Sequence, residues 1–417
     1  MKNKKALYLL LSANAISHFA QGISMLAIPW YFAKQLGAAS TFATIYSVAT
    51  FLTLFWGLYA GTLIDRFPRK NIFLGICALS SLVLLGVSAI GFVEGSIPMF
   101  WVAFVFCFTL FNYNIHYPTL YAFGQEITEK ENYSKTNSLL EVIGQSTNVL
   151  SGAMAVLLIE GVNAELMGFQ IQIEAWPIHQ IFLVDGVTYI LAAILIKMIK
   201  YIPTSELKVN KEKIWIRFRE GLAYLRERPL LFHFGNASYT VFIFTLIATH
   251  VLWPIYIGSH LGLEGDVYAI NKVHYAVGAM LAGFFVSRIF RFTNSVASII
   301  ILSLIALTAF TTLSLTQNQL ILYLTAFFLG ISNAGIRIQR ITYLFNHIPN
   351  HIIGRSNSVF QSINILLRSL FLGIFSMAFF NQGSNIIWAM GIAAGMILIS
   401  LIPLAYNYKG LKEYKKV

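Results

Sequence analysis

A short charged stretch is the starting point for reading this chain: residues 61–70 are GTLIDRFPRK. Long apolar runs lie on both sides of it, at 40–64 and 71–93, and neither run contains a charged residue. About 20 apolar residues in a helix span ~30 Å of hydrocarbon, at about 1.5 Å of rise per residue. The stretch is therefore interpreted as a tight turn that joins two membrane-spanning helices.

The composition supports the same interpretation for the whole chain. Of its 417 residues, 57% are hydrophobic and 11% are charged, whereas a soluble domain carries about 25% charged residues. So few charges suffice only when most of the surface faces lipid. We predict an all-α integral membrane protein with about twelve transmembrane helices. The apolar runs that predict them lie at 7–33, 40–64, 71–93, 97–123, 137–160, 178–200, 230–257, 266–288, 293–316, 318–345, 356–380 and 385–406.

Lys and Arg are distributed unevenly among the connecting segments. With the N-terminus inside, the outer segments hold Lys34 alone, and the cytoplasmic segments hold the rest. This asymmetry predicts that both termini are cytoplasmic and that the number of spans is even. It also accounts for the net charge of +12 without a nucleic-acid partner, because the basic residues do not follow one polar face. We expect a multi-pass protein of a bacterial inner (cytoplasmic) membrane.

A polar and basic segment interrupts the series of spans at 204–229. Apolar residues recur within it at helical spacing, and these are Ile214, Phe218, Leu222 and Leu225. The pattern predicts an amphipathic helix on the inner leaflet, and a solvated linker is the alternative. Either interpretation divides the chain into a six-helix half at 1–203, the linker at 204–229, and a second six-helix half with a short basic tail at 230–417.

The two halves repeat one another. GTLIDR at 61–66 matches GFFVSR at 283–288, and KTNSL at 135–139 matches RSNSV at 355–359. The pair Pro29 and Tyr31 also recurs as Pro254 and Tyr256. Three matches at nearly one offset predict parallel repeats related by an axis along the membrane normal. Such repeats predict a binding cavity between the halves that opens to each side in turn.

The stretch at 61–70 resembles the signature loop of the major facilitator superfamily, G-x-L-x-D-R-x-x-R-[KR], and the resemblance covers the whole chain. Other segments resemble the exporter branch that includes macrolide efflux proteins and the enterobactin exporter. These are Tyr117-Pro118 with Gln125-Glu126, Asn137-Ser138-Leu139, FLVDGVTY at 182–189, and REGLAYLRERP at 219–229. The resemblance implies proton-driven export of bulky amphipathic molecules.

Two departures from the drug-exporter pattern accompany this resemblance. In the fifth span, Ser151-Gly152 stands where the pattern has Gly-Pro. The fourth span lacks the arginine that many drug/proton antiporters carry, and it offers Asn112, Asn114 and His116 instead.

The signature loop also suggests a gate. In the family's fold, Asp65 faces the N-terminus of the eleventh span, near Ser356, where the helix dipole favours an acid. Arg69 is then placed to pair with Glu126 at the inner end of the fourth span. The alternative is that the basic residues of the loop merely follow the positive-inside rule. The expected gating residues are Gly61, Asp65, Arg66, Arg69, Lys70 and Glu126.

Ionisable groups inside spans are costly, at roughly 2.5–3.5 kcal/mol each at the centre of the membrane, so they mark function by default. More than one helical turn from the ends of the predicted spans, the acidic residues lie in the first half, and the lysine and arginine residues lie in the second half. The proton-coupling candidates are Asp185, Glu141, His18 and His116. For each of them, a structural hydrogen-bonding role is the alternative.

Arg337 and Arg340 are three residues apart and share a face of the tenth span. Together with Arg368 they suit an anionic group such as a carboxylate, a catecholate or a phosphate, which arginine holds bidentately. Snorkelling to lipid headgroups is the alternative. Lys272 and His274 form a candidate second contact for the anion. The substrate-binding candidates are Gln21, Asn112, Lys272, His274, Arg337, Arg340 and Arg368.

The sequence therefore predicts a proton-coupled secondary transporter that exports a bulky amphipathic molecule, a siderophore or a macrolide-like drug. A lysophospholipid or metabolite carrier and a non-transporting receptor are the alternatives. No nucleophile–base pair, metal cluster or phosphate-binding glycine loop predicts an enzyme. We expect no cofactor and no metal. The expected partners are a small-molecule substrate, protons and the lipid bilayer, and the chain is expected to be a monomer.

Overall fold

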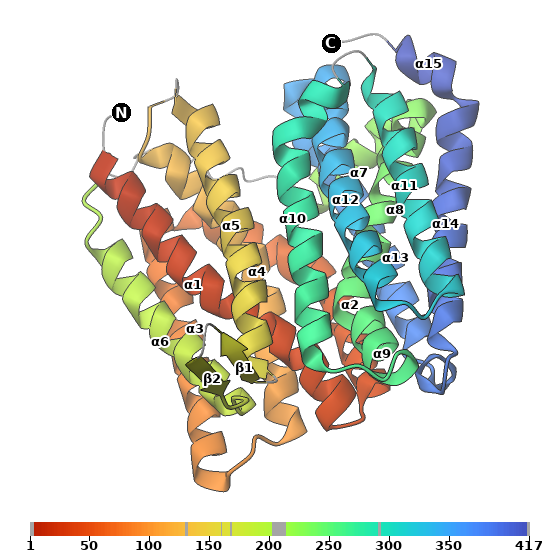
Figure 1. Ribbon diagram of the computed structural model, residues 1–417. Coiled ribbons are helices and arrows are strands. Elements are labelled where there is room, and N and C mark those ends of the chain that lie inside the picture. Colours follow the sequence, from red (N-terminus) through yellow and green to blue (C-terminus); the bar gives the residue numbers. More distant parts are fainter. Residues whose placement is uncertain are drawn as a thin grey trace. The chain divides into compact units, whose positions relative to one another are not determined.

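A computed structural model shows the fold (Figure 1). It describes the chain except for residues 1–3, 130–131, 160, 167–168, 202–213, 291–292 and 415–417, and some further side chains, among them those of Asp65, Arg66 and Glu141. The helices of the first part are α1 (Lys4–Trp30), α2 (Ala39–Arg66), α3 (Arg69–Glu94), α4 (Met99–Glu126), α5 (Tyr133–Ile159) and α6 (Ile178–Lys197). Those that follow are α7 (Ile214–Arg226), α8 (Pro229–Ile247), α9 (Trp253–Ile255), α10 (Gly265–Ile289), α11 (Ser295–Leu315), α12 (Gln319–His347), α13 (Asn350–Phe375), α14 (Ile386–Tyr406) and α15 (Tyr408–Lys412).

The predicted all-α membrane fold is confirmed. Eleven helical segments among the described residues are long and apolar enough to cross a membrane. Of the twelve predicted spans, only α1 falls outside this set. It is 27 residues long, which is sufficient to cross, but it carries several polar side chains that lower its hydropathy. These side chains are buried inside the protein, and they include Asn14, Ser17, His18, Gln21 and Ser24.

One small β-hairpin lies between α5 and α6, where the sequence predicted only an outer loop. Its strands are β1 (Val162–Leu166) and β2 (Phe169–Ile173), paired antiparallel with Val162 opposite Ile173. Two strands alone are marginally stable.

The backbone divides into two compact units. The first comprises Met1–Ala38, Leu52–Asn210 and Glu264–Val273, and the second comprises Ala39–Phe51, Lys211–Leu263 and His274–Val417. In the first unit, α1 packs on α5 and α6, and α3 packs on α4 and α6. In the second, α11 packs on α12 and α14, and α8 contacts α12, α13 and α14.

Small residues bring helices of the second unit into backbone contact. A Cβ atom at Gly278 of α10 would overlap the carbonyl of Phe327 on α12, and one at Gly330 of α12 would overlap the carbonyl of Tyr275 on α10. Such close approach is typical of helix pairs in membranes, where packing replaces the hydrophobic effect as the driving force.

The amphipathic helix expected in the linker is present as α7, and it packs on α13 within the second unit. Arg355 Nη1 lies 2.5 Å from Glu220 Oε2, and Gly221 lies against the backbone of Arg355. Leu225 is buried, whereas Trp215 is exposed. The apolar residues of α7 are therefore divided between the protein interior and the surface.

A π-helical turn occurs at corresponding places in the two sequence repeats. Tyr31 begins the turn Tyr31–Gln35, and Tyr256 begins the turn Tyr256–His260. The hydroxyl of Tyr31 donates to the Ile97 carbonyl (3.3 Å), and that of Tyr256 to the Thr316 carbonyl (2.5 Å). A left-handed glycine follows each turn, with φ of 59° at Gly37 and 67° at Gly262. The repeat seen in the sequence is thus also a repeat of backbone conformation.

Candidate functional site

The turn between α2 and α3 holds the residues expected to form a gate. Arg69 begins α3, and its Nη1 lies 3.4 Å from Glu126 Oε1 at the end of α4. The two side chains are only 16% and 15% exposed, so bulk solvent screens this pair less than it screens a surface pair. The contact between Arg69 and Glu126 is therefore present as predicted. Gly61, Asp65 and Arg66 lie in the last turns of α2. The side chains of Asp65 and Arg66 lie outside the described part of the chain.

Lys70 makes a connection that the sequence did not suggest. Its Nζ donates to the carbonyl oxygens of Lys197 (2.9 Å) and Ile199 (2.6 Å) at the end of α6. The last carbonyls of a helix have no partner within the helix, and a cation there is favourable. Lys70 therefore joins the start of α3 to the end of α6.

Asp185 lies on α6 and is 2% exposed. Its Oδ2 accepts a hydrogen bond from Ser24 Oγ on α1 at 2.6 Å. Its Oδ1 has no hydrogen-bond partner among the described residues. An unpaired buried charge is expensive, so a carboxyl group in this setting is suited to binding and releasing a proton.

Two histidines of the first unit, His18 and His116, lie in one polar cluster formed by α1, α4 and α5. His116 Nε2 lies 3.1 Å from Asn14 Oδ1. His18 is buried, with Asn148 and Gln21 beside its ring. The structure thus brings His18, Gln21 and His116 together, whereas the side chain of Glu141 lies outside the described residues. Asn14 was missed, although it lies four residues before His18 on the same helical face.

Asn112 lies apart from this cluster. Its Nδ2 donates to Ser80 Oγ on α3 at 3.0 Å. It also lines an apolar cavity between α2, α3 and α4.

Arg340 is held entirely by protein groups of the second unit. It is 4% exposed, and its Nη1 donates to the Ser238 carbonyl at 2.9 Å. Its guanidinium carbon lies 3.6 Å from the ring centroid of Tyr239, a cation–π contact that is worth ~2 kcal/mol when it is desolvated. Gln361 Nε2 lies 3.3 Å from the Tyr239 hydroxyl, so this ring links α8, α12 and α13.

Arg337 and Arg368 are only partly buried. Arg337 lies near Tyr275, whose hydroxyl accepts a hydrogen bond from Asn333 Nδ2 at 2.7 Å. Arg368 lies near Tyr46. One helical turn before Arg368, the buried Oδ1 of Asn364 has no hydrogen-bond partner in the described part of the chain. Asn364 is therefore an additional polar group for an incoming ligand, one that the sequence did not suggest.

The joint anion contact of Lys272 and His274 stays a prediction. Residues two apart on a helix point to different sides. Lys272 belongs to the first unit and His274 to the second, where the ring of His274 stacks on Tyr323 with centroids 4.8 Å apart. Within the described residues, no group of three His, Cys, Asp or Glu side chains is placed to hold a metal ion.

The chain is similar in sequence to two efflux proteins. It is 22% identical to macrolide efflux protein A of Streptococcus pyogenes over 284 residues, which are 67% of this chain and 65% of that protein. It is 29% identical to the multidrug efflux pump Tap of Mycobacterium tuberculosis (strain ATCC 25618 / H37Rv) over 93 residues, or 22% of each chain. The chain thus matches a little under two thirds of the macrolide efflux protein's length.

Solved structures share the fold. A D-xylose–proton symporter superposes with a TM-score of 0.68 over 97% of each chain, at 13% sequence identity. The family model of the Major Facilitator Superfamily matches residues 10–372, which is most of the chain. With its multi-pass helical fold and its relatives among efflux proteins, the chain belongs to the major facilitator superfamily.

Proposed function

We propose that this transporter is a proton-coupled exporter of a bulky amphipathic molecule, either a siderophore, which carries anionic groups, or a macrolide-like drug. The observation that carries the proposal is Asp185, a buried carboxyl group with a single hydrogen bond, from Ser24. The similarity to macrolide efflux protein A supports the efflux direction. In this proposal the halves 1–203 and 230–417, joined by 204–229, alternate access as a monomer in the inner membrane, with both termini cytoplasmic.

Asp185 is the best-placed proton carrier among the candidates. Its burial and its unpartnered Oδ1 make its charged form costly. Any change that brings a donor or water to Oδ1 favours release of the proton. The histidine cluster has more polar neighbours, and we assign His18 and His116 a supporting role in the same half.

The cargo's anionic group is assigned to Arg337 and Arg368. Arg340 is 4% exposed, donates to the Ser238 carbonyl and lies over the face of Tyr239, whereas Arg337 and Arg368 are more exposed. The two partly buried arginines offer the bidentate donors that carboxylates, catecholates and phosphates accept.

The Arg69–Glu126 ion pair is proposed to hold the cytoplasmic side closed, together with Asp65 in the same turn. The pair joins the first turn of α3 to the end of α4. Movement of one helix end relative to the other would break it, as the alternating access proposed here requires.

Proton flux into liposomes tests this proposal. The purified transporter is reconstituted with a pH-sensitive dye inside, and a proton gradient is imposed. A macrolide, a catecholate siderophore and a lysophospholipid are then added one at a time. We expect at least one of them to drive a proton flux that Asp185→Asn abolishes. Glu264→Gln should preserve this flux, because Glu264 is an exposed acid, 3.5 Å from Lys34.

The outcomes separate the candidate functions. A flux with the macrolide or the siderophore identifies an exporter and names its cargo class. A flux with the lysophospholipid alone would replace the exporter by a lipid carrier. Binding without proton flux for every compound, or a flux that Asp185→Asn leaves intact, would contradict proton coupling through Asp185.

A further inference from the structure

A cavity of about 720 Å³ lies within the first unit between α2, α3 and α4. Pockets for small molecules have volumes of roughly 300–1,000 Å³, so this one is large enough for an organic ligand. Among the described residues, its lining is apolar except for two amides, Asn71 and Asn112. None of the ionisable groups assigned above to protons or cargo lines it.

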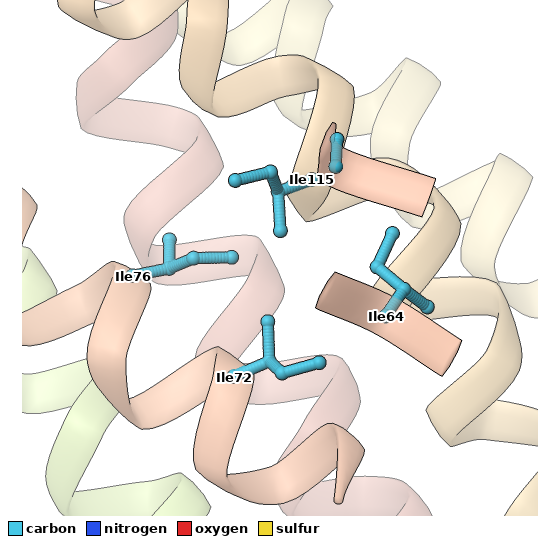
Figure 2. Close-up of a cluster of buried hydrophobic side chains, with 5 residues drawn as sticks. Ile64, Ile72, Ile76 and Ile115 are labelled. Atoms are coloured by element: carbon cyan, nitrogen blue, oxygen red, sulfur yellow. The ribbon is translucent and has the colours of Figure 1, made fainter. Parts of the chain in front are cut away.

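The inner wall of the cavity is a packed apolar cluster. Ile64 of α2, Ile72 and Ile76 of α3, and Ile115 of α4 point toward one another (Figure 2), and all four are buried. The last three also line the cavity. On the outer side, Leu63 and Leu79 line the cavity and are exposed. In a span, exposed leucines face hydrocarbon, so the cavity opens sideways toward the bilayer.

The length of α3 places the cavity in one leaflet. Asn71 lies in the first turn of α3, next to the Arg69–Glu126 pair. Leu79 lies eight residues further along, which is about 12 Å at 1.5 Å per residue. The cavity therefore extends from the headgroup level toward the middle of the membrane. With the predicted orientation, this is the inner leaflet.

The walls of the cavity are held in place, so the space is built into the fold. The indole N–H of Trp56 donates to the Phe111 carbonyl at 2.9 Å, which fixes the ring as part of the wall. Asn112, 8% exposed, is held by its hydrogen bond to Ser80. Gly75 leaves the space open, because no atom lies within 4 Å of where its Cβ would be.

We infer that this cavity binds the apolar chain of an inner-leaflet amphiphile. The exposed amide of Asn71 meets the polar head at the membrane surface, and the chain runs along Gly75 toward Leu79 and Phe108. A chain in the bilayer already lies in hydrocarbon, so its binding here depends on packing against the cavity wall and not on the hydrophobic effect. The bound apolar chain belongs either to a membrane lipid or to an amphipathic cargo. The proposed binding site is the same in both cases, and it does not depend on proton coupling.

Photolabelling of a matched pair of variants tests the site. The transporter in nanodiscs is exposed to palmitoyl lysophosphatidylcholine that carries a diazirine on its chain, and labelled peptides of α3 and α4 are mapped by mass spectrometry. Gly75→Phe fills the cavity. Gly86→Phe is the control, because Gly86 lies on the same helix with equally open surroundings but does not line the cavity.

We expect Gly75→Phe to reduce labelling of the cavity-lining residues by roughly tenfold, or about 1.4 kcal/mol of binding free energy, because the phenyl ring takes the space in which the chain packs. Gly86→Phe should leave the labelling unchanged. Both variants should keep a melting temperature close to that of the wild type, because a Cβ at either position has no atom within 4 Å. Equal labelling of all three proteins at these residues would overturn the inference.

Competition distinguishes the two sources of the chain. Unlabelled palmitoyl lysophosphatidylcholine and erythromycin, a macrolide, are added in excess before illumination. Competition by the lipid alone identifies a lipid site, and competition by both identifies an entry site for cargo. If neither reduces the labelling, the contact is unspecific and the proposed site does not exist.

Discussion

Two buried ionisable residues, one in each unit, are treated very differently by their surroundings. Asp185 of the first unit and Arg340 of the second are 2% and 4% exposed. Asp185 receives one hydrogen bond, from Ser24, and its second oxygen has no hydrogen-bond partner among the described residues. Arg340 donates to the Ser238 carbonyl and lies over the face of Tyr239. One group is barely stabilised by the protein, and the other is well stabilised.

The difference separates a functional role from a structural one. A buried cation that donates to a backbone carbonyl and lies over an aromatic ring of a neighbouring helix, as Arg340 does, holds the two helices together. A buried acid with an unpartnered oxygen gains a hydrogen bond when a conformational change brings it a donor, and this gain favours the charged form. We therefore expect substitutions of Asp185 to affect coupling and substitutions of Arg340 to affect stability.

The largest effect is expected for Asp185→Asn. Asparagine keeps an acceptor for Ser24 but carries no titratable proton, so cargo-driven proton flux should fall to that of protein-free liposomes. The free energy of unfolding should change by only about 1 kcal/mol, the scale of one hydrogen bond. Flux and thermal melting of the same preparation provide the measurement. If Asp185→Asn severely lowered stability while the folded fraction kept normal flux, Asp185 would have a structural role and not a role in coupling.

Arg340→Ala tests the other side of the comparison. Removal of this side chain should lower the free energy of unfolding by about 2–4 kcal/mol, because it leaves a cavity beside Tyr239 and removes the contacts between α12 and α8. Cargo flux per folded molecule should stay near the wild-type value. Denaturation in detergent together with flux normalised to folded protein measures both. A stable variant that no longer transports would assign Arg340 to the cargo site.

Much of the fold could be predicted from the sequence, because lipid imposes a simple rule of length and hydropathy on each span. Where that rule is relaxed, the sequence is less informative. The polar residues of α1 lower its hydropathy because they face protein. The hairpin strand Phe169–Ile173 reads FQIQI, an alternation of apolar and polar residues that does predict a strand. Its signal was overlooked among the helical runs.

The candidate site was predicted only where local spacing or the signature loop determines it. The loop pointed to the Arg69–Glu126 contact, and the spacing of Arg337 and Arg340 placed them on one face. Their different surroundings follow from residues far away in the sequence, such as Ser238 and Tyr275. Ser238 binds Arg340 through its backbone carbonyl. Every residue has such a carbonyl, so the identity of the residue does not predict this contact.

Arg337→Ala sharpens the contrast between the two arginines of α12. Arg337 is less buried than Arg340, so its loss should leave the free energy of unfolding within about 1 kcal/mol of the wild type. Binding of an anionic cargo should weaken roughly tenfold or more, because a hydrogen bond to a charged group contributes about 1.5–3 kcal/mol. An uncharged analogue of the cargo is the control, and its affinity should not change. Equal losses for both compounds would contradict a role for Arg337 in binding the anion.

The smallest effect is expected for the Arg69–Glu126 pair, which lies between the two extremes. Both charges are present and partly exposed, so each offsets the desolvation of the other, and neither depends on a neutral hydrogen-bonding partner. A double-mutant cycle with Arg69→Gln and Glu126→Gln should give a coupling of about 0.5–1 kcal/mol, and the coupling should fall as salt is raised. Lys34–Glu264, a more exposed pair, is the matched reference and should couple more weakly. A coupling energy that does not change with salt concentration would indicate that the pair is as deeply desolvated as Asp185. Breaking the pair to open the cytoplasmic side would then cost too much free energy for a gate.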